Sequence, residues 1–106
     1  MVSEISEKDF KKEIGANKGI AIVDFWAPWC GPCKMLGPIF ERLASSAQYS
    51  RMKFAKVNID ENESLASEQG IMSIPCIVFF KDGEEVERMV GFSGEDALKM
   101  KLNKYV

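Results

Sequence analysis

Residues 29–34 read Trp29-Cys30-Gly31-Pro32-Cys33-Lys34 and follow closely on an apolar run from Ala21 to Trp26. Two cysteines at this spacing can form a disulfide and reopen it, so the segment is suited to moving two electrons. A buried strand that leads into a helix would place Cys30 at the helix N-terminus, where free N–H groups and the macrodipole favour a thiolate. We therefore expect Cys30 to be a nucleophile within an α/β fold.

A Cys-x-x-Cys pair is also found in zinc and iron–sulfur sites. Tetrahedral zinc needs four ligands, usually Cys or His, whereas this chain has 3 cysteines and no histidine. A metal site would have to share its ion between chains or recruit carboxylates. We therefore expect neither a metal nor a cofactor.

Size and composition indicate one domain, spanning residues 1–106, with 46% hydrophobic and 28% charged residues. A net charge of −2 without a basic stripe argues against a nucleic-acid partner. No apolar run approaches the ~20 residues of a membrane span, so we expect no membrane partner. The segment Met1–Glu7 lacks the basic start and apolar stretch of a secretory signal. An odd cysteine count with one close pair fits a reducing compartment, which favours the cytoplasm.

Apolar periodicity and turn signals predict an alternating order of helices and strands. The helices are expected near residues 6–15, 30–47, 62–70 and 93–105, and the strands at 20–26, 52–59, 76–80 and 84–90, with room for a short strand at 2–5. Pro38 should bend the second helix, and Asn62 should cap the third. Asp82-Gly83 predicts a tight hairpin between the last two strands.

This order, with Cys-Gly-Pro-Cys at the start of the second helix, resembles the thioredoxin family. Matching segments run along the whole chain: residues 23–34, Ala55-Lys56-Val57-Asn58-Ile59-Asp60, Ile74-Pro75 and Gly91. The resemblance implies a thioredoxin fold, in which a central mixed β-sheet is flanked by helices on both faces. It also implies that Cys30 attacks, that Cys33 resolves the intermediate, and that Pro75 is a cis proline facing the cysteines.

Members of this family reduce disulfides in other proteins. The resemblance therefore implies disulfide-containing target proteins as substrates and a thioredoxin reductase as the electron donor. We expect a monomer. Two other functions stay open: a disulfide oxidase or isomerase of the same fold, and a non-catalytic interaction subunit.

In the second step of reduction, Cys33 must be deprotonated before it can attack Cys30. The chain has no histidine to act as the near-neutral base, and Asp24 is the best substitute. Burial disfavours the charged form of a carboxyl, which raises its pKa toward that of a thiol. We expect Asp24 to exchange the proton.

Asp24 interrupts its apolar strand in phase with Ile22, which places it within the sheet. Lys56 shares one face of the neighbouring strand with Met52 and Phe54. An Asp24–Lys56 pair across parallel strands would explain both charged residues. The alternative is a solvated Asp at the strand end and a Lys whose stem packs while its ammonium reaches water.

A flat apolar surface around the exposed sulfur of Cys30 is expected to bind extended target peptides. Its expected members are Trp29, Gly31, Pro32, Ile74, Pro75 and Gly91. Trp26 is assigned to the core. From the residues alone, Pro75 could equally be a trans proline that begins an edge strand.

Cys76 is the one clear departure from the family pattern, in which a threonine usually follows the cis proline. Strand alternation turns residue 76 away from the side on which Pro75 faces the dithiol. We expect a buried, inert thiol. The alternative is a third thiol that reaches Cys30 and Cys33.

Overall fold

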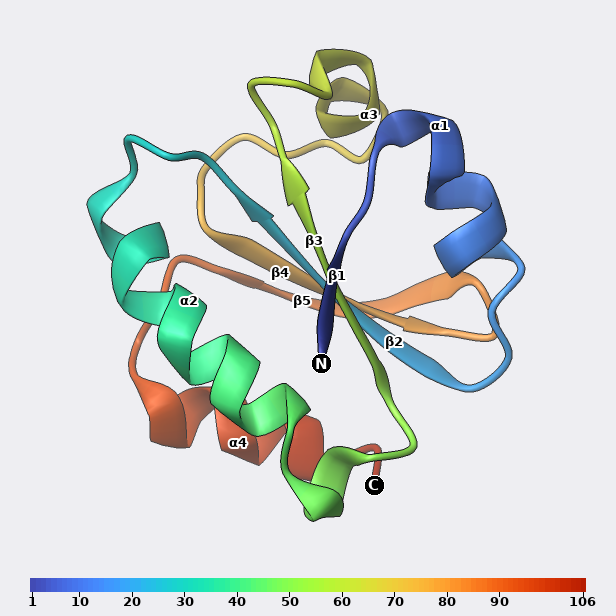
Figure 1. Ribbon diagram of the computed structural model, residues 1–106, viewed down its shortest axis with the longest axis vertical. Helices are drawn as coiled ribbons and strands as arrows, with labels where there is room; N and C mark the ends of the chain where they lie inside the picture. The colour runs from blue at the N-terminus through green and yellow to red at the C-terminus, as the bar shows by residue number, and fades with distance from the viewer.

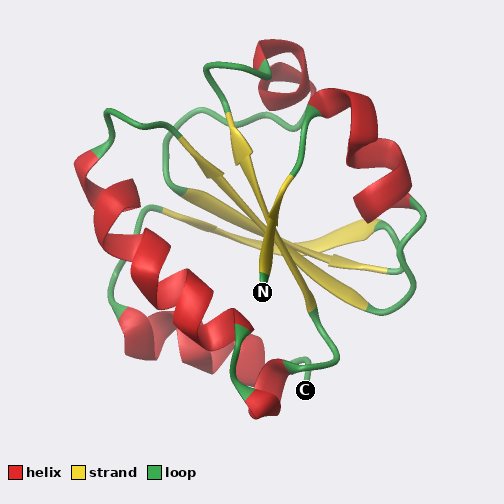
Figure 2. Cartoon of the chain, viewed as in Figure 1, coloured by secondary structure: helices red, strands yellow, loops and turns green.

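The computed structural model describes residues 1–106 as a five-stranded sheet between two layers of helices (Figures 1 and 2). Along the chain the elements are β1 (Val2–Glu4), α1 (Glu7–Phe10), the π-helical turn η1 (Lys11–Gly15), β2 (Ile20–Trp26), α2 (Gly31–Ala44), the 3-10 turn η2 (Ala47–Tyr49), β3 (Lys53–Asn58), α3 (Glu63–Glu68), β4 (Cys76–Lys81), β5 (Glu84–Val90) and α4 (Glu95–Asn103). The short strand expected near residues 2–5 is present as β1. None of the helices has the length and apolar character needed to cross a bilayer.

The strands lie in the order β1-β3-β2-β4-β5. β1 and β2 both run parallel to β3, whereas β4 is antiparallel to its neighbours β2 and β5. The sheet is therefore mixed, as the family resemblance implied. Because β2 is central, the loop that follows it projects from the middle of the sheet, and this loop leads to the dithiol at the start of α2 (Figure 1).

Alternate residues of β2 serve the two faces of the sheet. Ile22 packs in a cluster with Leu36 of α2 and Leu98 of α4, while Val23 packs in a second cluster with Phe10 of α1. α2 and α4 thus cover one face, and α1 and α3 cover the other (Figure 1). A charged residue in phase with Ile22 must lie beneath the α2 and α4 layer.

The first two helices differ from the sequence expectation. The second helix was expected to reach Ala47 but ends at Ala44. There the chain turns into η2, whose start is capped by the Ser46 hydroxyl accepting from the Gln48 N–H. Pro38 lies within one continuous helix. The first helix is also not uniform, because α1 widens into the π-helical turn η1 after one turn.

The predicted capping of α3 by the Asn62 side chain is wrong. Asn62 occupies the N-cap position, but its carboxamide oxygen accepts from the Glu7 N–H at 2.8 Å and its NH2 donates to the Asn58 carbonyl at 2.9 Å. The Glu7 carboxylate instead accepts from the Leu65 N–H at 3.1 Å. α3 is therefore capped by a side chain from α1, and the two helices are tied together.

The expected Asp-Gly hairpin joins β4 to β5. Asp82 and Gly83 both adopt positive φ, 51° and 85°, as a two-residue hairpin turn of this kind requires. A side chain at Gly83 would also collide with the Gly15 carbonyl. Glycine is needed here for both reasons.

Candidate active site

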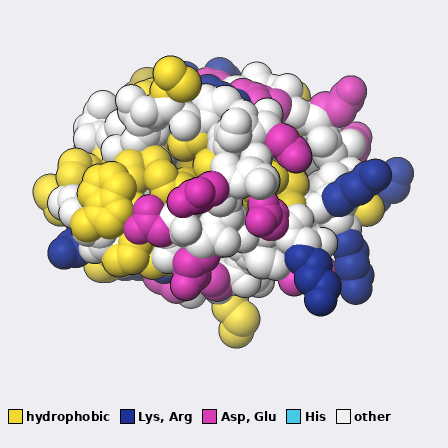
Figure 3. All heavy atoms as spheres, turned by 90° about the horizontal axis from the view of Figure 1, so that it is seen from above, with side chains coloured by type: hydrophobic (Ala, Val, Ile, Leu, Met, Phe, Trp, Pro, Cys, Tyr) yellow, Lys and Arg dark blue, Asp and Glu magenta, His cyan; other side chains and the backbone are white.

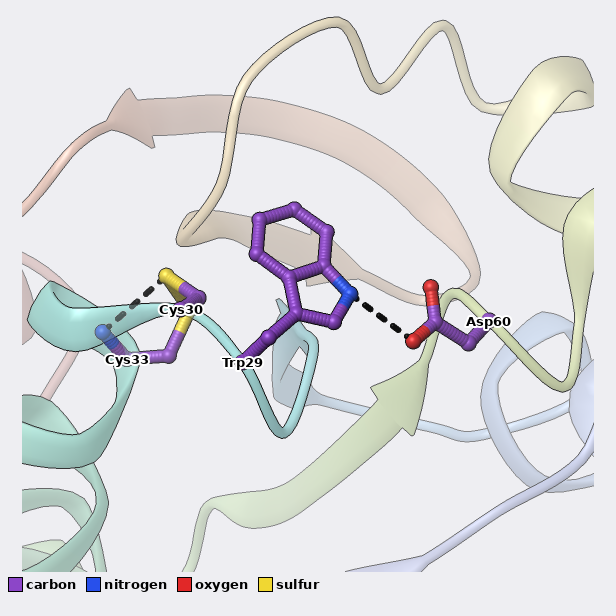
Figure 4. The surroundings of a disulfide bond; sticks show 4 residues. All are labelled: Trp29, Cys30, Cys33 and Asp60. Atoms are coloured by element: carbon purple, nitrogen blue, oxygen red, sulfur yellow. Dashed lines mark hydrogen bonds between the residues drawn. A yellow bond between two sulfur atoms is a disulfide. The ribbon is translucent and has the colours of Figure 1, made fainter.

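The two active-site cysteines lie at the N-terminal end of α2. Cys30 is the N-cap residue and Cys33 lies in the first turn, and the two are joined by a disulfide with a Cα–Cα distance of 5.2 Å. The Cys33 N–H donates to the Cys30 sulfur at 3.2 Å (Figure 4). The first turn carries no acidic residue, so nothing there opposes the positive end of the helix dipole. This geometry favours a thiolate on Cys30 once the disulfide is reduced.

The expectation of an exposed Cys30 sulfur needs correction. Cys30 and Cys33 are each 5% exposed and pack with Ala27, Trp26 and Ile74. Their neighbours Gly31 and Pro32 are exposed, and no cavity of the structure is lined by either cysteine. A partner must therefore dock against a flat surface to reach the sulfur.

Trp29 lies beside the disulfide with its side chain 66% exposed. Its indole N–H donates to the Asp60 carboxylate at 2.9 Å, and the ring lies between the cysteines and Asp60 (Figure 4). Trp26 differs from the core assignment in one respect, since it is only partly buried and donates to the Glu4 carboxylate at 3.3 Å. Asp60 and Glu4 were not singled out from the sequence. The only available signal was the position of Asp60 directly after a strand that resembles the family.

Asp24 is 2% exposed and one of its carboxylate oxygens has no hydrogen-bond partner. Burial raises its pKa to about 7, while Lys56 lowers it and Glu4 raises it to smaller extents. The carboxyl can therefore gain and lose a proton near neutral pH.

Lys56 pairs in register with Asp24 across β2 and β3, but the two form no ion pair. The ammonium of Lys56 instead lies 4.4 Å from the centroid of the Trp26 ring. This corrects the expected pairing, because Lys56 acts on Asp24 through space rather than by direct contact. Full neutralisation by a bound cation would have kept the pKa of Asp24 low.

The loop before β4 contributes Ile74 and Pro75, whose peptide bond is cis. Ile74 packs against the two cysteines, and Pro75 is buried. The Gly91 N–H donates to the Pro75 carbonyl at 2.8 Å, with Gly91 at a positive φ of 84°. Pro75 is therefore not exposed on the surface as expected; it lies beneath it and joins Gly91 to Ile74, which packs on the dithiol.

Cys76 is 1% exposed and belongs to the apolar cluster on the α1 and α3 face, apart from the cysteine pair. It is a free thiol, and burial raises its pKa. Arg88 is close enough to Cys76 to oppose that rise. Cys76 is therefore buried, as predicted, and lies apart from Cys30 and Cys33.

Taken together, these groups can perform thiol–disulfide exchange. The helix N-terminus activates one sulfur, the second sulfur is held at bonding distance, and a carboxyl that titrates near neutrality is buried in the same strand–helix unit.

Comparison with known proteins agrees with this chemistry. The family model described as Thioredoxin matches residues 1–104. The chain is 42% identical over 105 residues to a thioredoxin of Porphyra purpurea, covering 99% of this chain and 97% of that protein. It is 40% identical over 105 residues to a thioredoxin of Bacillus subtilis (strain 168), covering 99% and 98%. The crystal structure of a Malassezia sympodialis thioredoxin superposes with a TM-score of 0.90 at 36% identity, covering 99% of this chain and 90% of that chain.

Proposed function

The chain belongs to the thioredoxin family. On this basis we propose the role of each active-site residue in disulfide reduction. The protein is a thiol–disulfide oxidoreductase that reduces protein disulfides through Cys30 and Cys33. The observation that carries this function is the disulfide between these two cysteines at the N-terminus of α2.

Reduction proceeds in two exchange steps. The Cys30 thiolate attacks one sulfur of the target disulfide, forms a Cys30–target disulfide, and releases the other target sulfur as a thiolate that takes up a proton. The Cys33 thiolate then attacks the Cys30 sulfur, forms the Cys30–Cys33 disulfide and releases the second target thiol. Two electrons and two protons have moved from the protein to the target.

Asp24 is the proton acceptor for Cys33 in the second step. Its support is burial with an unpartnered oxygen and a pKa of about 7, between those of an ordinary carboxyl and an ordinary thiol. Lys56 has an indirect role, since its charge limits the rise of the Asp24 pKa. Without Lys56, Asp24 would hold its proton to higher pH.

The target segment binds along the surface formed by Trp29, Gly31, Pro32, Ile74 and Gly91, with the buried Pro75 joining Ile74 to Gly91. Its backbone pairs with Ile74, the residue before the cis proline. The support is that Ile74 packs on the cysteines while Trp29 presents an exposed ring beside them. A thioredoxin reductase returns electrons to the disulfide at the same surface. The protein acts in the cytoplasm, carries electrons between reductase and targets, and works as a monomer.

Two cysteine variants test the assignment of roles. With dithiothreitol as electron source, Cys30→Ser abolishes reduction of a protein disulfide because the attacking sulfur is gone. Cys33→Ser also fails to turn over, but it accumulates a stable disulfide with the target, which non-reducing electrophoresis and mass spectrometry detect. Cys76→Ser is the matched control: it should stay active and should form no stable disulfide with the target. Stable adducts with Cys30→Ser and none with Cys33→Ser would reverse the assignment.

A further inference from the structure

A groove beside the dithiol has a lining that the reduction chemistry does not use. It lies between the end of β3, α3 and the loop before β4, and its volume is about 410 Å3. The size is within the range of ordinary small-ligand sites, roughly 300–1,000 Å3. Ile59, Ala66 and Ile71 supply apolar side chains, and Met72 stands at the groove with 94% of its surface exposed.

The groove is continuous with the proposed target surface. Asp60 lines it and also accepts the indole N–H of Trp29 at 2.9 Å. At the other end, the loop that carries Ile71 and Met72 runs directly on to Ile74, which packs on the cysteines. A segment of a target bound at the dithiol would therefore pass the mouth of the groove.

All charged residues that line the groove are acidic. Asp60 and Glu63 line it, both are exposed, and neither forms an ion pair. The chain contains no Lys or Arg between Lys56 and Lys81. Figure 3, viewed from the end of the molecule where these loops lie, shows acidic side chains next to a patch of hydrophobic ones. Arg88, which donates to the carbonyl of the lining residue Gly70, is already paired with Glu85.

An apolar groove whose two carboxylates have no cationic partner matches a long side chain that has an aliphatic stem and a cationic end. A purely apolar side chain would leave the two carboxylates unmatched, and an acidic side chain would be repelled. We propose that the groove receives a Lys or Arg side chain that flanks the reactive cysteine of the target. The protein would thus prefer disulfides set in basic segments. This inference rests on the proposed function, because it assumes that targets bind at the dithiol surface.

The preference should depend on position along the target. Lys34 directly follows the dithiol and is exposed, so the surface near the cysteines carries a positive charge as well as the carboxylates of the groove. The groove lies on the Trp29 and Asp60 side, and only target residues on the corresponding flank can reach it.

The test uses synthetic peptides with one cysteine in mixed disulfide with 5-thio-2-nitrobenzoate, whose release is followed by absorbance. Lysine is stepped one residue at a time along both flanks of the cysteine. At each position it is compared with norleucine, which keeps the stem without the charge, and with glutamate. We expect kcat/KM to rise about two- to five-fold for lysine over norleucine at one flank only, the range of an exposed ion pair. The ratio should fall toward one as salt is raised.

Variants of Glu63 assign the preference to the groove. Glu63→Gln should lose most of the lysine-to-norleucine ratio, and Glu63→Lys should invert it in favour of glutamate. The matched control is Glu84→Gln, an equal change of charge at the end of the β4–β5 hairpin remote from Pro75, and it should keep the wild-type ratio. Thermal unfolding of each variant confirms that α3 still folds.

Equal kcat/KM for the lysine and norleucine peptides at every position would overturn the proposal, because the groove would then not distinguish a charged side chain from an apolar one. The same loss with Glu84→Gln as with Glu63→Gln would also overturn it, because the effect would then follow net charge. In both cases the norleucine peptide is still reduced. Failure to reduce the norleucine peptide at all would instead contradict the proposed function.

Discussion

Asp24 shows how one buried residue can link stability to chemistry. Its pKa is raised from 3.8 to about 7, so between these values the folded chain keeps a proton that the unfolded chain has lost. The free energy of unfolding therefore falls as pH rises through this window. Above it, the charged carboxylate costs up to about 4 kcal/mol.

Asp24→Asn should accordingly stabilise the protein at pH 8 by a few kcal/mol, with a gain that shrinks on acidification and vanishes below about pH 4. Urea unfolding at several pH values measures this gain. Asp96→Asn is the matched control, because Asp96 is exposed and should show little change at any pH. A gain for Asp24→Asn that does not depend on pH would show that the carboxyl is not the cause.

The same variant should slow turnover and change its pH dependence, because Cys33 loses its proton acceptor. Rates measured from about pH 6 to pH 9 cover the titration of the carboxyl and of an ordinary thiol. Wild type should gain activity as Asp24 ionises near pH 7, and Asp24→Asn should lack that rise. An unchanged pH profile would exclude Asp24 as the acceptor.

Cys76 should react slowly with iodoacetamide in the native protein, because it is 1% exposed and burial raises its pKa. Alkylation at each cysteine of the reduced protein is followed by peptide mass spectrometry, with Cys30 as the internal reference. Cys76→Thr should retain nearly full reductase activity. A dominant air-oxidation disulfide that involves Cys76, or a several-fold loss of activity, would contradict the assignment of an inert thiol.

At the scale of elements, Arg88 of β5 holds the end of α3. Its guanidinium donates to the carbonyls of Gln69 at 2.8 Å and Gly70 at 3.3 Å, and it pairs with Glu85 at 2.7 Å. These carbonyls lie at the negative end of α3, where a cation is favourable. The loop from Gly70 to Pro75 leaves from this point, so Arg88 supports the approach to the dithiol.

Arg88→Gln should lower the free energy of unfolding by about 1–2 kcal/mol, since hydrogen bonds from a charged, partly buried group are lost. Urea unfolding measures the loss. Arg42→Gln is the comparison, because its pair with Glu95 is more exposed and should contribute less than about 1 kcal/mol. Equal effects of the two variants would show that the contact with α3 adds nothing.

Across the whole molecule, Glu87 fastens the last helix to the edge of the sheet. Its carboxylate forms ion pairs with Lys101 and Lys104 and accepts a hydrogen bond from the Tyr105 hydroxyl at 2.6 Å. One side chain of β5 therefore binds three residues of the C-terminal segment. Hydrogen bonds from Lys101, Lys104 and Tyr105 lower its pKa to about 2. The charged form therefore stabilises the fold above the ordinary carboxyl pKa, and this stabilisation is lost as pH falls toward 2.

Glu87→Gln should destabilise the domain at neutral pH by about 1 kcal/mol, and the difference from wild type should disappear in acid. Glu84→Gln, on the same strand without an ion pair, should have no such effect. Melting temperatures of the three proteins at neutral and acidic pH provide the comparison. A deficit for Glu87→Gln that persists unchanged in acid would rule out the charge as its source.

The sequence by itself determined the order of elements, the Asp82-Gly83 hairpin and the position of the dithiol at the start of a helix. These features depend on neighbours in the chain: an apolar run makes a buried strand, positive φ suits Asp-Gly, and a proline after Cys30 fits the first turn. Alternation within a strand was equally sufficient to bury Asp24 and to separate Cys76 from the cysteine pair.

Only the tertiary structure decided which partners these residues meet. Lys56 stands in register with Asp24 yet turns to the ring of Trp26, and α3 is capped by Glu7 rather than by its own Asn62. The bond from Trp29 to Asp60 spans 31 residues of sequence. Pattern fixes the strand face on which a side chain lies, whereas a hydrogen bond or ion pair requires contact within about 3 Å. Several groups compete at that distance, and packing of loops and helices selects among them.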